Sequence, residues 1–167
     1  MLQKQQISEK PDEQLVALQI AGETYGIDIS CIHSIIRMQE ITRVPQAPHF
    51  VEGVTNLRGS VIPVVDLRKR FDLPVTEPTK STRIVVVDME EKTVGMIVDG
   101  VSEVMRIPGA AIDPPSPIVA GISSEYIRGV GKSEDRLVIL LDLPAVLSEA
   151  VKPEPGNIAA GGERLAA

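Results

Sequence analysis

The sequence predicts an all-β protein with a few short helices, built as two similar small barrels that pack around a shared core. Two observations lead to this prediction. Short runs rich in Val and Ile alternate with turn residues along most of the chain. The same unit of about five short strands also occurs twice. Strands this short and this few remove their exposed edges best by closing into barrels.

The strand runs are separated by Gly, Pro, Asp and Glu-rich turns. Two of the separations predict hairpins, one between residues 15 and 29 and one between 84 and 98. Pro63 cannot donate to a strand ladder, so it marks an edge or a bulge of its strand. The predicted strands are Leu15–Ile20, Tyr25–Ile29, Val61–Val65, Ile84–Met89, Val94–Val98 and Leu137–Leu141. Short helices are expected at Ser30–Met38, Leu67–Phe71, Ser102–Met105 and Pro144–Ala150.

The internal repeat is visible at two offsets. A shift of 69 residues places Leu15–Arg37 on Ile84–Arg106, and Gly26 then meets Gly95. A shift of 76 residues places Phe50–Phe71 on Tyr126–Leu147, and the pair Asp66-Leu67 recurs as Asp142-Leu143. Positions that are apolar or Gly in both copies are scaffold candidates, whereas positions that differ sharply are candidates for a function of one copy.

The repeat predicts how the domain is organised. Residues 1–13 and 151–167 are polar or rich in Pro, Gly and Ala without periodicity, so both segments are expected to be flexible. Residues 14–150 are expected to form a single domain. Within it, the first barrel unit is predicted at about 15–73 and the second at about 84–148.

Composition narrows the possible functions. The net charge is −6 and the pI about 5.0, without a basic stripe, which argues against nucleic acid and anionic membranes as partners. Aromatic residues are only 2%, too few for stacking on bases. No signal peptide and no apolar run of membrane-spanning length is present. With a single cysteine, these features predict a cytoplasmic protein without membrane insertion.

An enzyme would have to be built from Cys31, His33 and His49. A thiolate–imidazole pair is a known nucleophilic arrangement, but the sequence places no third orienting group beside Cys31 and His33. These three residues have no recognised zinc spacing either, and the glycines form no phosphate-binding loop. We therefore expect no catalytic residues, no metal and no cofactor.

The sharpest difference between the two copies is the turn before the strand at Val61–Val65. The first copy reads Thr55-Asn-Leu-Arg-Gly59, whereas the second reads Gly131-Lys-Ser-Glu-Asp135, an ordinary polar hairpin tip. Gly59 supplies a positive φ and Asn56 tolerates one, so the turn itself is explained. The turn does not explain why position 58 is an arginine. Arg58 is either a solvated turn arginine or a forked donor for a partner's carboxylate or carbonyl groups.

Several motifs resemble the CheW-like domain family over about Gln14 to Leu147. They are Tyr25-Gly-Ile-Asp-Ile29, Phe50-Val-Glu-Gly-Val-Thr-Asn-Leu-Arg-Gly59, Val61-Ile-Pro-Val-Val-Asp-Leu67, Gly95-Met-Ile-Val-Asp-Gly-Val101 and Glu125-Tyr-Ile-Arg-Gly129. The resemblance implies two five-stranded, SH3-like barrels around a shared core. It also implies an adaptor that couples chemoreceptor signalling tips to the histidine kinase CheA through the kinase's regulatory domain. Contacts between copies in receptor-array rings are a further possibility.

In this family the helical receptor tip lies in a groove between the barrels. The groove residues that the resemblance implies here are Ile32, Ile35, Gly53, Asn56, Leu57, Arg58, Gly59, Val98, Val101 and Val104. The kinase is bound through exposed barrel ends, where no single residue is assigned. Ile32 and Ile35, three apart on the expected helix, either present apolar surface to a partner or belong to the core.

Two points remain open from the sequence. Many family members carry Glu where this chain has Ser34, although the repeat partner Glu103 keeps the carboxylate, so Ser34 is not assigned to the groove. A scaffold for another chemosensory-type kinase pathway, such as surface motility or development, is the alternative within the same class.

Overall fold

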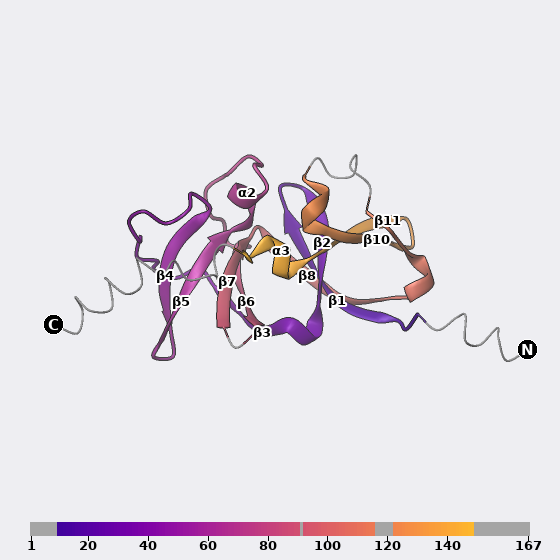
Figure 1. The fold of residues 1–167 in the computed structure, drawn as a ribbon, viewed down its shortest axis with the longest axis horizontal. Coiled ribbons are helices and arrows are strands. Elements are labelled where there is room, and N and C mark those ends of the chain that lie inside the picture. The colour runs from indigo at the N-terminus through magenta and orange to yellow at the C-terminus, as the bar shows by residue number, and fades with distance from the viewer. Residues whose placement is uncertain (1–9, 91, 116–121, 149–167) are drawn as a thin grey trace, which may run out of the picture.

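A computed structural model describes residues 10–90, 92–115 and 122–148. In this part of the chain eleven strands form two sheets that lie side by side, with two short α-helices (Figure 1). The all-β prediction is confirmed. The predicted tail at 151–167 and residues 1–9 of the predicted N-terminal segment lie outside the described residues, and no described helix is long and apolar enough to span a membrane.

The first sheet has the order β8-β1-β2-β11-β10-β9 and the second the order β3-β6-β7-β5-β4. The strands of the first sheet are β1 (Glu13–Ile20), β2 (Glu23–Asp28), β8 (Gly100–Ile107), β9 (Ile112–Asp113), β10 (Ile127–Ser133) and β11 (Arg136–Leu141). Those of the second are β3 (Ile32–Arg37), β4 (Val51–Leu57), β5 (Ser60–Asp66), β6 (Arg83–Met89) and β7 (Lys92–Val98). Both predicted hairpins are present, as β1–β2 and β6–β7.

The two repeat copies exchange strands. Hairpin β1–β2 comes from the first copy, but β1 pairs with β8 and β2 pairs in parallel with β11, both from the second copy. The second sheet repeats this arrangement, since β6 pairs with β3 and β7 pairs in parallel with β5. The prediction of one barrel from residues 15–73 and another from 84–148 was therefore wrong. The repeat is a sequence unit, whereas each barrel is assembled from both copies.

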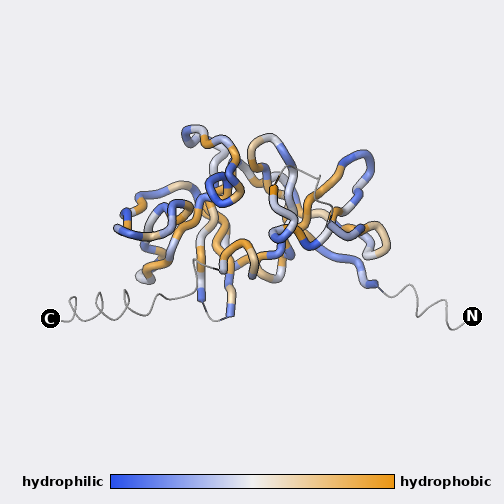
Figure 2. Tube along the Cα trace, turned by 45° about the horizontal axis from the view of Figure 1, so that its top comes forward, coloured by the Kyte–Doolittle hydropathy of each residue, from blue (hydrophilic) through white to orange (hydrophobic). Residues whose placement is uncertain are grey.

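Strands buried on both faces explain the unbroken apolar runs. In β1, Leu15 and Ala17 face the interior of the first barrel, whereas Val16 and Leu18 face the core between the barrels. The second barrel has its own interior cluster around Ile84 and Val86. The core between the barrels takes side chains from both sheets, which confirms the predicted shared core. Hydrophobic segments accordingly run along the central strands, and hydrophilic ones lie mainly in the loops (Figure 2).

Two predicted helices, Ser30–Met38 and Ser102–Met105, were wrong. After a single 3-10 turn at Ile29–Cys31, the first segment continues as β3, and the second lies within β8. Each strand carries a β-bulge at the same repeat position, between Ile32 and Ser34 and between Val101 and Glu103. A bulge adds one residue to a strand, so apolar residues three apart return to the same face. This spacing imitates the period of a helix.

The other two predicted helices are present as α2 (Leu67–Arg70) and α3 (Leu143–Val146). Each begins at an aspartate N-cap, Asp66 in α2 and Asp142 in α3, whose side chain accepts a backbone N–H of the first turn. Arg70 donates from Nε to the carbonyl oxygen of Val146 at 2.8 Å and thereby connects the end of α2 to the end of α3.

Candidate protein-docking site

Strands β3 and β8 occupy equivalent edges of the two sheets, and both direct apolar side chains toward the junction of the barrels. Ile35 pairs with Val85 and Val104 pairs with Val16. Directly opposed residues of neighbouring strands lie on the same face of a sheet. Val85 and Val16 belong to the shared core, so Ile35 and Val104 lie on the core side of their strands.

These edge residues are accessible as well as apolar. The exposed fraction is 40% for Ile35 and 55% for Val104. Ile32 and Val101, at the other end of each bulge, are half-buried and pack against the shared core. The four residues thus form two equivalent apolar strips that begin in the core between the barrels and emerge at its rim. We call them the edge strips.

The tip of the β4–β5 hairpin lies next to the end of β3. Gln39, two residues after β3, donates from Nε2 to Thr55 Oγ1 at 2.8 Å and to the carbonyl oxygen of Asn56 at 2.7 Å. Leu57 packs with Ile36 against the interior of the second barrel. These contacts hold Thr55, Asn56 and Leu57 against β3 and the residues that follow it.

Arg58 occupies an unusual backbone conformation at this tip. Its φ is +52°, followed by +90° at Gly59, and Asn56 Oδ1 accepts the N–H of Gly59 at 2.9 Å. A positive φ is costly for a side chain with a Cβ, and such residues concentrate at functional sites. Glu134 has a φ of +55° at the equivalent tip of the second copy. The turn therefore accepts different side chains in this conformation, and the fold does not require arginine at position 58.

Two predicted groove residues are not available to a partner. Val98 is fully buried in the shared core, so its assignment to the groove was wrong. Gly53 is also buried, with a φ of +149°, and a Cβ there would lie 2.0 Å from the carbonyl oxygen of Thr42. Glycine at this position allows the segment at Thr42 to bond to β4, which is a structural role.

Glu103, which holds the carboxylate that Ser34 lacks, is itself engaged. Its Oε2 accepts from Nη2 of Arg136 at 2.6 Å on the surface of the first barrel. Ser34 Oγ lies 3.4 Å from Nδ1 of its neighbour His33. The two repeat positions therefore differ in both charge and contacts.

The cysteine and histidines do not form a catalytic pair in the described part of the chain. Burial, followed by the charge of Asp28, raises the pKa of the Cys31 thiol, which disfavours the thiolate that a nucleophile needs. His33 is exposed, and its imidazole faces the hydroxyl of Ser34. His49 packs edge-on against Phe50 with ring centroids 5.9 Å apart. No three His, Cys, Asp or Glu side chains among the described residues gather as a potential metal site.

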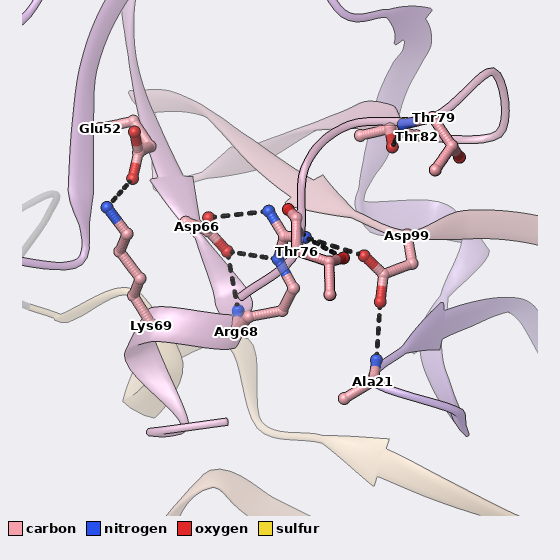
Figure 3. Close-up of polar contacts among 9 residues, drawn as sticks. All are labelled: Ala21, Glu52, Asp66, Arg68, Lys69, Thr76, Thr79, Thr82 and Asp99. Carbon is pink, nitrogen blue, oxygen red and sulfur yellow. Dashed lines mark hydrogen bonds and ion pairs between the residues drawn. The ribbon is translucent and has the colours of Figure 1, made fainter. Parts of the chain in front are cut away.

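A buried ion-pair network at Arg68 was missed by the sequence reasoning. Arg68 donates from Nε to Asp66 Oδ1 and pairs through Nη2 with Asp66 Oδ2, both at 3.0 Å. Its Nη1 reaches Asp99 Oδ1 at 3.1 Å, and Asp99 Oδ2 accepts the N–H of Ala21 in the β1–β2 turn (Figure 3). The network connects the two barrels. The sequence did carry a signal, since the repeated Asp-Leu pair is followed by Arg68 in one copy and Pro144 in the other.

Comparison with known proteins gives the family. The model of the CheW-like domain matches residues 14–151. The chain belongs to the CheW-like domain family.

Similar proteins match this CheW-like chain over most of its length. The chemotaxis protein CheW of Bacillus subtilis is 36% identical over 140 residues, which covers 84% of this chain and 90% of that protein. The chemotaxis protein CheW of Klebsiella aerogenes is 32% identical over 147 residues, with coverages of 88% and 89%. The crystal structure of the scaffolding protein TtCheW from Thermoanaerobacter tengcongensis has a TM-score of 0.78 at 35% identity, covering 85% of this chain and 97% of that chain.

Proposed function

We propose that this CheW-like chain is a non-catalytic adaptor that couples chemoreceptor signalling tips to the histidine kinase CheA. Its place in a family of chemotaxis proteins and scaffolds supports the adaptor role. The observation that carries the proposal is the pair of edge strips. Apolar side chains that continue from a core to its rim are suited to contact with another protein, and this supports the edge strips as the interaction surface.

The edge strips suit a helical partner. An amphipathic helix binds a groove that offers apolar contacts and a few polar groups to orient it. Ile35 and Val104 supply apolar contact from the two barrels, and Arg58 supplies a forked donor near the end of β3. We assign the receptor tip to this surface, with Ile32, Ile35, Val101 and Val104 as apolar contacts and Arg58 as the orienting group.

The kinase is expected to use other surfaces. Two further equivalent residues, Val61 and Leu137, are 66% and 56% exposed near the hairpin tips. They are candidates for contact with the kinase regulatory domain or with another copy of the chain. Acting through these partners, the adaptor would work in the cytoplasm, recruited to membrane-associated receptor arrays.

Replacing Arg58 tests the receptor assignment. We expect Arg58→Ala and Arg58→Glu to weaken receptor-tip binding about 10- to 100-fold, since a charge-assisted hydrogen bond contributes roughly 1.5–3 kcal/mol. The melting temperature should stay within a few degrees, because the equivalent turn closes around Glu134. The measurements are calorimetric titration with a receptor-tip fragment and with the kinase regulatory domain, beside thermal unfolding.

Glu134→Ala is the matched control, because it changes a charged residue in the same conformation on the other hairpin tip. It should leave receptor binding unchanged. Strong destabilisation by Arg58→Ala, or equal loss of receptor binding in both variants, would remove the assignment of Arg58.

The adaptor role also predicts that Cys31 and His33 carry no activity. The double variant Cys31→Ala/His33→Ala should assemble with receptor tip and kinase and stimulate the kinase within about twofold of the unchanged protein, a difference below 0.5 kcal/mol. The reason is that a half-buried thiol with a raised pKa and an exposed imidazole form no catalytic pair. A turnover that depends on Cys31 in a substrate screen would contradict a purely adaptor function.

A further inference from the structure

A groove with a cavity volume of about 720 Å³ opens on the first barrel, outside the proposed receptor site. It lies between the 3-10 turn at Ile29–Cys31, the start of β1 and the N-terminal end of α3. Its lining includes Asp28, Leu141, Asp142 and Pro144. Nothing in the adaptor proposal uses it.

The internal repeat shows what the equivalent place in the second barrel contains. The offset of 76 carries Asp142 to Asp66 and Pro144 to Arg68, and the offset of 69 carries Ser30 to Asp99. The equivalent of the groove is therefore the Arg68 network, where a guanidinium is held by Asp66 and Asp99 with an exposed side-chain fraction of only 4%. In the first copy of the repeat, the side chain of Arg68 fills this position. In the second copy, Pro144 stands at the equivalent position and the groove is open.

Two carboxylates of the groove, those of Asp28 and Asp142, each have an oxygen that can still accept a hydrogen bond. Asp142 Oδ1 accepts the N–H of Ala145 at 3.2 Å, and Asp28 Oδ1 accepts the N–H and hydroxyl of Ser30 at 2.9 and 2.8 Å. The second oxygen of each accepts no hydrogen bond from the described residues. A carboxylate with a free oxygen is suited to a forked guanidinium donor.

The charge of the groove favours a cation. Four acidic side chains line it, Asp12, Glu13, Asp28 and Asp142, against two arginines, Arg106 and Arg128. Glu13 and Arg128 form a two-bonded pair at 2.5 and 3.2 Å. The bond to Glu13 raises the pKa of Arg128, and the charge of Asp28 adds to this, which leaves Asp142 as the acidic group of the groove farther from that pairing. Subtracting two positive charges from four negative ones leaves −2, so an incoming arginine meets a complementary field.

We propose that this groove is a docking site for an arginine side chain presented by a partner protein, with Asp142 as its principal acceptor. The internal copy supplies the mode of binding, since the equivalent aspartate already holds a guanidinium through two oxygens. The site is distinct from the edge strips, so its failure would leave the receptor proposal untouched.

Titration with blocked tripeptides, followed by amide NMR shifts of the full chain, tests the proposal. Glycyl-arginyl-glycine should shift the amides of Ser30, Cys31 and Leu143 saturably, and the lysine peptide should bind about 10-fold more weakly, because an ammonium lacks the planar fork. The neutral citrulline peptide should not bind. Asp142→Asn should abolish the shifts while keeping the helix, because asparagine caps as well as aspartate.

Pro144→Arg is the second test, with Pro144→Ala as its control. The introduced arginine should fill the groove as Arg68 fills its own, which would block the peptide and raise the melting temperature by about 3–8 °C over the alanine variant. The proposal is overturned if the arginine peptide causes no shifts, if Asp142→Asn binds it as well, or if Pro144→Arg is neither more stable than Pro144→Ala nor closed to the peptide.

Discussion

Cutting the chain between Glu77 and Pro78 and expressing the two parts separately is expected to abolish the folding of each part as a monomer. The cut lies in the exposed connector that leads from α2 to β6. It breaks no strand, yet it separates β1 from β8, β2 from β11, β3 from β6 and β5 from β7. Neither part then contains a complete barrel or the shared core, so all cooperative stability should be lost.

Mixing the two parts should restore the fold, because all of the lost pairings are complementary between them. Far-ultraviolet circular dichroism and amide NMR dispersion would show an unfolded spectrum for each part and a native one for the mixture. As a control, the complex obtained by co-expressing both parts should give the same circular dichroism and NMR spectra as the intact chain. A monomeric first part with a cooperative thermal transition would contradict the exchanged arrangement of strands.

Arg68→Ala is expected to destabilise the protein by about 3–5 kcal/mol, the usual cost of removing one partner from a buried ion pair. The side chains of Arg68 and Asp66 are only 4% and 3% exposed. Without the guanidinium, Asp66 stays buried without its counter-charge, and Asp99 loses the contact that connects it to α2. The free energy of unfolding, measured by urea titration, checks the prediction.

Arg136→Ala is the matched control for Arg68→Ala. Its ion pair with Glu103 is shorter, at 2.6 Å, but the side chains are 48% and 49% exposed. Exposed pairs contribute about 0–1 kcal/mol, because water and salt screen them. If both variants lose the same small amount of stability, the Arg68 network does not hold the barrels together.

The sequence predicted six of the eleven described strands (β1, β2, β5, β6, β7 and β11), the short helices α2 and α3 and the repeat, because each rests on local patterns. It could not predict which copy supplies the neighbour of each strand. The exchange of β1–β2 between copies is a long-range choice that leaves every local pattern unchanged. The two bulged strands β3 and β8 were predicted as helices for a similar reason. Ile32 and Ile35 return to one face of β3 only because the bulge inserts an extra residue between them, and a spacing of three is also typical of a helix.

The candidate site was predicted in part. Ile35 and Val104 were assigned through the family resemblance, and Arg58 through both the resemblance and the difference between the repeat copies. The exposure of Ile35 and Val104 is compatible with a contact role. Val98 was misassigned, because an apolar residue in a motif looks the same whether it faces a groove or a core. Arg68 was overlooked because charged residues are rarely buried, and only its partners in space explain its position.

The exchange of strands also has a consequence for synthesis on the ribosome. When α2 has left the exit tunnel, β3 still lacks β6, its partner among the described strands. The second sheet is complete once β7 has followed, but the first sheet is complete only when β11 has followed. About 70 further residues must be translated in that interval, which takes roughly 4–14 s at ~5–20 residues per second. Throughout this time the nascent chain exposes unpaired, valine-rich strand edges. The first barrel can therefore close only late in the translation of the chain.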